Sequence, residues 1–167
     1  MGDYYQTIVA DYLRADRAVF INTECTIQIQ PGKTPPKGSS WCCDIVAVDF
    51  RQPAVFLCEV TYSSTMQALI ERLRAWNNHW ADMRGILENY NRLPLNDKWR
   101  IRPWLFVPRE YVARLLRGLK EIRDGGPLRF EPLITTLEMV QPWNYCTYDR
   151  HGERLELKDD IPEEMRV

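Results

Sequence analysis

Two apolar segments separated by a short break constrain the fold of this 167-residue chain more than any other feature. The first segment runs from Trp41 to Phe50 and the second from Ala54 to Thr61, with Gln52-Pro53 between them. Valine, isoleucine and other apolar residues fill both segments, and a turn signal lies between them. This pattern predicts two antiparallel strands that are joined by a tight turn.

Each predicted strand contains an acidic residue where an interior strand normally has an apolar one. These residues are Asp44 in the first strand and Glu59 in the second. An ionised carboxylate is costly to bury unless it is paired with a cation or bound to a metal. The two acids are therefore the strongest candidates for functional residues in the chain.

The length of the turn decides whether the two acids can meet. With an even loop, Arg51 lies opposite Ala54, and counting back then places Asp44 opposite Thr61. Side chains alternate along each strand, so Asp44 and Glu59 share a face, roughly 7–8 Å apart. Two carboxylates at that spacing can bind one hard cation, although an odd loop or a bulge would reverse the faces.

Length and composition are typical of one globular domain. We expect a single α/β domain over residues 1–158 and an acidic, frayed tail over 159–167. The net charge of −1 gives no overall attraction to nucleic acid or membrane, so any such contact depends on a local patch. No apolar run could span a bilayer and no signal peptide begins the chain, which favours a cytoplasmic protein without membrane contact.

The cysteines do not form a recognisable metal-binding pattern. There are five of them without a Cys-x-x-Cys spacing, and His79 and His151 are the only histidines. A structural zinc site is therefore not expected. Reduced, mostly buried cysteines of a cytosolic protein are the simpler interpretation.

The remaining elements follow from periodicity and from turn residues. We predict helices over Asp3–Arg17, from Ser63 or Ser64 to about Tyr90, and over Glu110–Arg123. Further strands are predicted over Val19–Gln30, Arg100–Val107 and Phe130–Val140, with a loop over Gln30–Ser40 and a final hairpin of Tyr145–Tyr148 and Arg154–Leu157.

Two groups of basic residues are candidates for contact with nucleic acid. Lys33 and Lys37 lie in the loop before the Asp44 strand, and Arg114, Arg117 and Lys120 lie on the outer side of the Glu110–Arg123 helix. A solvated helix face is the simpler explanation for the second group.

The order helix, strand, loop, strand, strand, long helix, strand, helix, strand resembles that of the PD-(D/E)xK nuclease superfamily. An Asp early in the second strand and Glu-x-Thr at the end of the third support this resemblance, which covers Asp3 to Val107. The loop of Gly, Lys and Ser before Asp44 looks most like the archaeal Holliday-junction resolvase branch. The resemblance implies an α/β fold of the restriction-endonuclease-like type, with a mixed β-sheet flanked by helices, to which the C-terminal β-hairpin would be added.

The resemblance also implies a function and a site. Asp44, Glu59 and the backbone carbonyl of Val60 would bind Mg²⁺ or Mn²⁺, and the substrate would be nucleic acid, with DNA favoured over RNA. The family has a lysine two residues after the glutamate, and Thr61 stands there. Losing such a charge typically costs about 2–4 kcal/mol of transition-state stabilisation, or roughly 10²–10³-fold in rate.

Two interpretations of the missing lysine remain open. In the first, the protein is a metal-dependent endonuclease in which Lys33, Lys37 or Arg72 supplies the positive charge. In the second, it is a catalytically degenerate nuclease-fold protein that acts as a nucleic-acid-binding or protein-interaction subunit, with a homodimer as a candidate assembly. Perturbed acids alone do not decide between them, because Asp44 can cap a loop and Glu59 can pair with Arg72.

Overall fold

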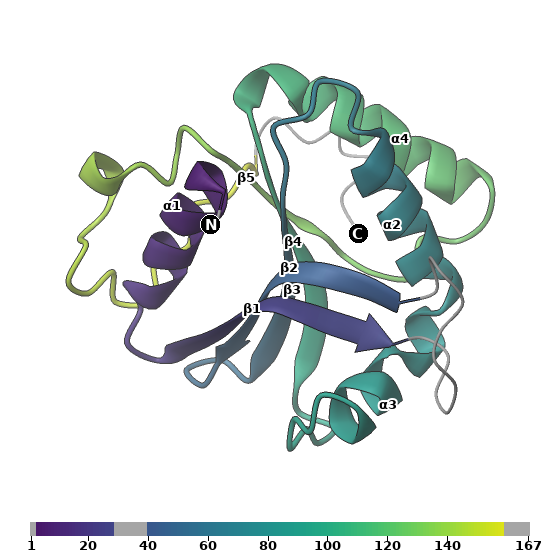
Figure 1. Ribbon diagram of the computed structural model, residues 1–167, viewed down its shortest axis with the longest axis horizontal. Helices are drawn as coiled ribbons and strands as arrows, with labels where there is room; N and C mark the ends of the chain where they lie inside the picture. The colour runs from purple at the N-terminus through teal and green to yellow at the C-terminus, as the bar shows by residue number, and fades with distance from the viewer. Residues whose placement is uncertain (1–2, 29–39, 159–167) are drawn as a thin grey trace.

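A computed structural model describes residues 3–28 and 40–158, without the side chains of Ser40 and Trp41. Its helices and strands follow one another in the order shown in Figure 1. They are α1 (Tyr4–Arg14), β1 (Val19–Gln28), β2 (Ser40–Asp49), β3 (Ala54–Val60), α2 (Gln67–Asn78), α3 (Trp80–Asn89), β4 (Arg100–Val107), η1 (Arg109–Tyr111), α4 (Val112–Asp124), β5 (Leu133–Thr136) and η2 (Pro142–Asn144).

The strands form one mixed five-stranded sheet in the order β1-β2-β3-β4-β5. β1, β2 and β3 are antiparallel neighbours, whereas β3, β4 and β5 run parallel to one another. The predicted α/β class with a mixed sheet is therefore confirmed. So is the central position of the two acid-bearing strands, because β3 is the middle strand and β2 lies beside it.

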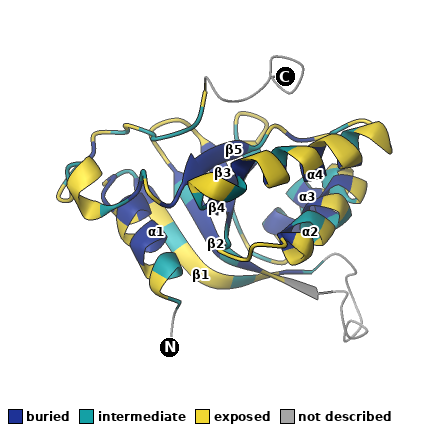
Figure 2. Cartoon of the chain, turned by 90° about the horizontal axis from the view of Figure 1, so that it is seen from above, coloured by how far each residue is buried: buried dark blue, intermediate teal, exposed yellow. Residues whose placement is uncertain are grey.

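Helices cover both faces of the sheet (Figures 1 and 2). α1 and the C-terminal segment lie on one face, and α2, α3 and α4 lie on the other. Val55 and Leu57 of β3 pack on the side of α2, while Phe56 and Cys58 pack on the side of α1. A strand that is buried on both faces reads as a continuous apolar run, which explains the sequence of β3.

The first helix forms as its sequence predicts. Asp3 caps it, since the backbone N–H of Tyr5 donates to Asp3 Oδ1 (3.0 Å). Its apolar stripe, which includes Val9, Tyr12 and Leu13, is fully buried against the sheet. This packing fixes the start of the chain beside β2 and β3.

The predicted pairing of Arg51 with Ala54 is wrong by two residues. Residues 50–53 form an even connection, as expected, but Asp49 rather than Arg51 lies opposite Ala54. The cause is the Asp49 side chain, whose Oδ1 accepts from the backbone N–H groups of Arg51 (2.8 Å) and Gln52 (3.3 Å). Such an Asx turn closes the hairpin earlier than the apolar pattern indicates.

The predicted long helix is two helices, and its predicted start is also wrong. α2 ends and α3 begins around His79, whose backbone (φ −111°, ψ 16°) leaves the helical region. Its N–H donates to the carbonyls of both Ala75 (3.2 Å) and Trp76 (3.1 Å). α2 starts after Met66, which has a left-handed backbone (φ 55°), so neither of the two preceding serines caps it.

α4 presents an apolar face to the sheet and a basic face to solvent. Val112, Leu115, Leu119 and Ile122 are buried, and the helix stops at Gly125, as predicted. Gly118 lies so close to α2 that an added Cβ would stand 2.2 Å from the side chain of Ile70. The short η1 turn precedes α4, where the sequence predicts continuous helix.

The C-terminal hairpin predicted over Tyr145–Leu157 is absent, since no strand forms in the described residues 145–158. The expected turn is present, with positive φ at His151 (51°) and Gly152 (78°). The segment after the turn packs on α1 instead. The backbone N–H of Leu155 donates to the Tyr12 hydroxyl (2.8 Å), and the Arg150 guanidinium lies over the Tyr12 ring at 4.5 Å.

The last strand is shorter than predicted. β5 comprises Leu133–Thr136 rather than Phe130–Val140, and a turn follows in which the N–H of Met139 donates to the Thr136 carbonyl (3.0 Å). β5 ends with its parallel neighbour β4, so its length is set by pairing and not by the longer apolar run. The predicted loop over 30–39 and the tail over 159–167 lie outside the described residues.

Candidate functional site

Asp44 and Glu59 lie where the pairing between β2 and β3 ends. The last paired residues are Ile45 and Cys58, so the next step of the same register brings Asp44 opposite Glu59. The Asp44 side chain itself continues the contact, because the backbone N–H of Val60 donates to Asp44 Oδ2 (2.8 Å). The Asp44 carboxylate thus takes the place of a backbone carbonyl as the acceptor for this N–H of β3.

The strand on the other side of Asp44 is irregular at the same level. Thr23 pairs with Ile45 and Cys25 pairs with Cys43, but Glu24 between them has a left-handed backbone (φ 53°). A non-glycine residue with this conformation is strained. Cys43 packs on the side of α2, whereas Ile45, with the same parity, packs on the side of α1. The regular alternation of β2 is therefore interrupted at Asp44.

Glu59 is almost completely buried, with 3% of its surface exposed. Its Oε2 accepts a short hydrogen bond from Arg72 Nη1 of α2, so the pairing with Arg72 that the sequence left open is present. Oε1 has no hydrogen-bond partner among the described residues. A buried acceptor without a partner typically costs about 1–3 kcal/mol. The site therefore contains an oxygen atom that is available to a ligand.

The environment disfavours negative charge on both acids. Burial and the nearby Asp44 raise the pKa of Glu59 to about 8, although Arg72 and the backbone N–H of Asp44 oppose this rise. Burial also raises the pKa of Asp44, against the opposing effects of the Val60 N–H, Arg72 and the Gln6 side chain. The raised pKa values mean that the nearby positive charge does not fully compensate two ionised acids, so a bound cation would stabilise their ionised forms.

Thr61 cannot supply the positive charge of the missing lysine. Its backbone N–H donates to the Phe106 carbonyl (3.1 Å), and its hydroxyl accepts from the N–H of Ser63 (3.2 Å). The threonine thus joins β3 to β4 and shapes the following loop. The cation that the structure does bring to the acids is Arg72, whose side chain is 27% exposed.

The other predicted site residues do not join this cluster in the described structure. Arg114, Arg117 and Lys120 are exposed on α4 and form no ion pair there with Asp44 or Glu59. Lys33 and Lys37 lie outside the described residues. Val60 is half-buried beside the two acids, with its N–H on Asp44.

The Gln6 side chain of α1 forms a hydrogen bond with Asp44 and lowers its pKa. One feature of the site was not recognised in the sequence. Cys43 and Cys58 lie next to the acids in the chain and are fully buried, on opposite faces of the sheet. Their thiols remain protonated, since burial raises both pKa values well above the ordinary range. Their positions in the sequence next to Asp44 and Glu59 were the signal that could have revealed these buried thiols.

The donor set fits a magnesium ion better than a structural zinc ion. No group of three or more His, Cys, Asp or Glu side chains converges in residues 3–28 and 40–158. Mg²⁺ commonly uses only one or two carboxylates and completes its shell with water. Asp44 and Glu59 provide that minimum, and the unpartnered Oε1 of Glu59 is one of the oxygens.

Comparison with known proteins gives no independent assignment. No protein-family model, curated protein or solved structure matches the chain. Within the described residues, no helix is long and apolar enough to cross a membrane.

Proposed function

We propose that the protein is a divalent-metal-dependent nuclease of the PD-(D/E)xK type, which hydrolyses phosphodiester bonds of DNA or RNA in the cytoplasm. The observation that supports this most directly is the buried, unpartnered Oε1 of Glu59 beside Asp44. The element order and the central position of β3 agree with the restriction-endonuclease-like fold that the sequence resembles.

Asp44, Glu59 and the carbonyl of Val60 would hold Mg²⁺ or Mn²⁺. Such an ion supplies an activated water molecule and stabilises the departing oxygen. Asp44 is already held in position by the Val60 N–H, which fixes one carboxylate without using the free oxygen of Glu59. The burial of Glu59 limits the access of bulk water to its carboxylate, which strengthens electrostatic interactions inside the site.

Arg72 would take the part of the absent lysine. Its guanidinium pairs with Glu59, and its partial exposure leaves donors that can face a phosphate group. A guanidinium forms charge-assisted hydrogen bonds with phosphate oxygens and stays protonated at any physiological pH. Arg72 therefore provides a fixed positive charge from α2 instead of one from the end of β3.

The degenerate interpretation has its own support in the same contact. Arg72 already occupies one oxygen of Glu59, and Thr61 supplies no charge. In that case the protein is a nucleic-acid-binding or protein-interaction subunit, as a monomer or a homodimer, and the exposed cations of α4 are one candidate contact surface.

A cleavage assay separates these functions. Protein purified in EDTA is incubated with single-stranded and duplex DNA and RNA, with Mg²⁺ or Mn²⁺ added back. For a nuclease we expect metal-dependent nicking that Glu59→Gln abolishes. Glu71→Gln is the matched control, because Glu71 is exposed on α2 and contacts only Gln67 in the described structure. Absence of cleavage with every metal would favour the degenerate interpretation.

A further inference from the structure

A second, oppositely charged region lies at the amino end of β4. Two cavities of about 560 Å³ and 320 Å³ open there, and Arg100 and Arg102 line both of them. The basic side chains around the two cavities form what we call the basic rim: Arg84, Lys98, Arg100, Arg102, Arg129 and Arg154.

Most of the positive charge of the basic rim is not neutralised within the described structure. Lys98, Arg100, Arg129 and Arg154 form no ion pair with a described acidic side chain, although Arg154 lies over the Phe56 ring at 5.7 Å. Asp97 and Glu131 are the only acids that line the two cavities in the described residues. The basic rim therefore has more positive than negative charge.

Arg102 lies in the basic rim in an environment that disfavours its charged form. Its guanidinium donates to the Glu131 backbone carbonyl (2.9 Å) and lies 3.6 Å from the Glu131 carboxylate. Burial is the largest cause that lowers the pKa of Arg102; the attraction of Glu131 and Glu156 raises it, and repulsion from Arg154 and Arg100 lowers it. A bound anion would relieve this repulsion.

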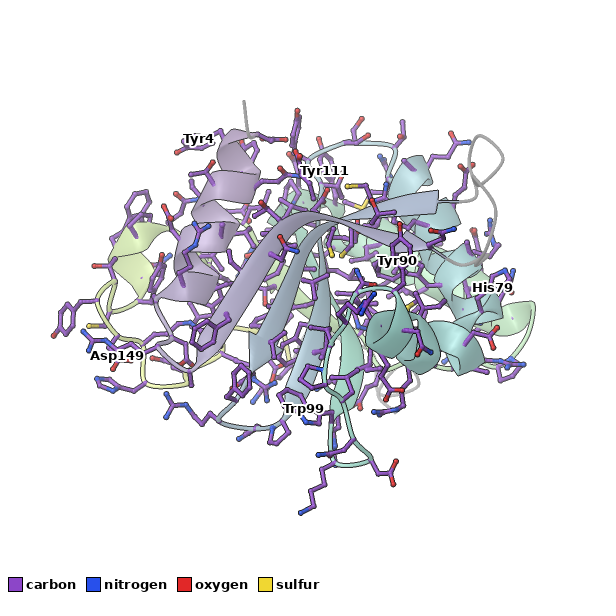
Figure 3. The ribbon with its side chains drawn as sticks, turned by 60° about the horizontal axis from the view of Figure 1, so that its bottom comes forward. Tyr4, His79, Tyr90, Trp99, Tyr111 and Asp149 are labelled. Carbon is purple, nitrogen blue, oxygen red and sulfur yellow. The ribbon has the colours of Figure 1, made fainter. Side chains whose placement is uncertain are left out.

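Aromatic rings, half-buried at Trp99 and exposed at Phe50 and Phe20, continue the surface beside the basic rim. Trp99 lines the larger cavity and lies at one end of the sheet in Figure 3. Its ring meets Phe50 edge-on, with centroids 5.4 Å apart, and Phe50 contacts Phe20 at 5.6 Å. Phe50 and Phe20 are 57% and 64% exposed, which is unusual for phenylalanine in a folded protein.

We propose that the basic rim and its aromatic neighbours bind single-stranded nucleic acid. Phosphates would lie over Lys98, Arg100 and Arg154, and bases would stack on Phe50 and Trp99. Unpaired cations beside exposed aromatic rings are the combination that single-strand binding uses, because every base has a face to stack. A duplex would not offer those faces. The proposal does not depend on the nuclease function, since no residue of the acidic site takes part.

The test is fluorescence anisotropy of labelled single-stranded DNA and RNA oligonucleotides, measured in EDTA over a range of salt concentrations. For the variant Lys98→Ala/Arg100→Ala, we expect binding weaker by about tenfold at low salt. The slope of log affinity against log salt should become less steep by about 1.4, because binding releases fewer counterions when two phosphate contacts are lost. Both residues are exposed, so the fold should be retained. The matched control Arg14→Ala/Arg74→Ala removes the same charge from exposed positions of α1 and α2 and should leave binding unchanged.

A second arm tests stacking and distinguishes nucleic acid from other polyanions. Phe50→Leu should weaken oligonucleotide binding several-fold and leave dextran sulfate binding unchanged, because only bases stack on the ring. Tyr148→Leu, at a 76% exposed aromatic residue, is the control. No binding at low salt, or equal losses in the two double variants, would overturn the proposal. A Phe50→Leu variant that binds oligonucleotide as the wild type does would instead assign the basic rim to an acidic protein or another polyanion.

Discussion

The two ends of the parallel pair β3–β4 carry opposite charges, and both are incompletely compensated. At the carboxyl end, burial raises the pKa values of Glu59 and Asp44. At the amino end, burial and neighbouring arginines lower the pKa of Arg102. Each end therefore disfavours its own charged form. The comparison indicates that the first end can be stabilised by a cation and the second by an anion.

The two ends are too far apart to form one small-molecule site. Ala54 pairs with Arg100 at one end, and Val60 pairs with Phe106 at the other. Six residues of extended strand span roughly 20 Å. Figure 3 shows the same separation, with Trp99 and Tyr111 near opposite ends of the sheet. A single ligand that touches both ends must be a chain, and nucleic acid is one.

The largest expected effect concerns the missing charge at the acidic end. If the protein cleaves nucleic acid, Thr61→Lys should raise the rate by about 10²-fold or more, because it adds a fixed positive charge beside the phosphate. The measurement is the initial rate of cleavage of a labelled oligonucleotide with Mn²⁺. Thr65→Lys adds the same charge in the exposed part of the loop and should change the rate little. Equal rates for the two variants would show that position 61 has no special electrostatic role.

The second prediction removes the internal cation of the acidic end. Arg72→Ala leaves both oxygens of Glu59 without a hydrogen-bonding side chain, so the free energy of unfolding should fall by about 1–3 kcal/mol at neutral pH. Urea denaturation measures this change. The exposed neighbour Arg74→Ala should stay within about 0.5 kcal/mol of the wild type. A comparable loss in both variants would mean that the change in free energy of unfolding comes from the helix composition and not from the contact between Arg72 and Glu59.

The sequence predicted the elements at these two ends only where local patterns determine them. The bounds of β4 and the acids of β2 and β3 are as predicted, because they depend on local periodicity and on turns beside it. The hairpin register was missed because the Asp49 side chain sets it. The break at His79 was missed because apolar residues continue in helical spacing from Trp76 to Met83 across it.

Long-range contacts account for the remaining differences between the sequence-based predictions and the structure. The C-terminal segment pairs with Tyr12 of α1 instead of with itself, and no local pattern indicates that partner. The basic rim combines side chains from α3, the loop before β4, β4 itself and two later segments, so no local pattern of the sequence indicates it. Arg72 was foreseen as a partner of Glu59, since both lie near the same end of the sheet in the predicted order.

The third prediction tests the acidic end as a cation site. Mn²⁺ should bind weakly to the wild type in isothermal titration calorimetry, and Asp44→Asn should reduce the affinity by about tenfold or more, because a carboxylate ligand is lost. Asp82→Asn, at an exposed position in the first turn of α3, is the control and should bind as the wild type does. Identical titrations for wild type and Asp44→Asn, or no heat in either, would show that Asp44 and Glu59 do not form a metal site. The acidic end would then have no cation ligand to match the anion proposed for the basic rim.

The last prediction concerns the pH dependence of stability in the metal-free protein. The pKa of Glu59 is about 8 in the folded chain and near the ordinary value of 4.5 when unfolded. Between these values the folded state binds more protons than the unfolded state, so stability falls as pH rises. The slope is at most about 1.4 kcal/mol per pH unit. Glu59→Gln cannot ionise and should lose this contribution, which chemical denaturation in EDTA at pH 6, 7 and 8 measures. Parallel curves for wild type and Glu59→Gln would show that Glu59 is ionised throughout and that Arg72 compensates its charge.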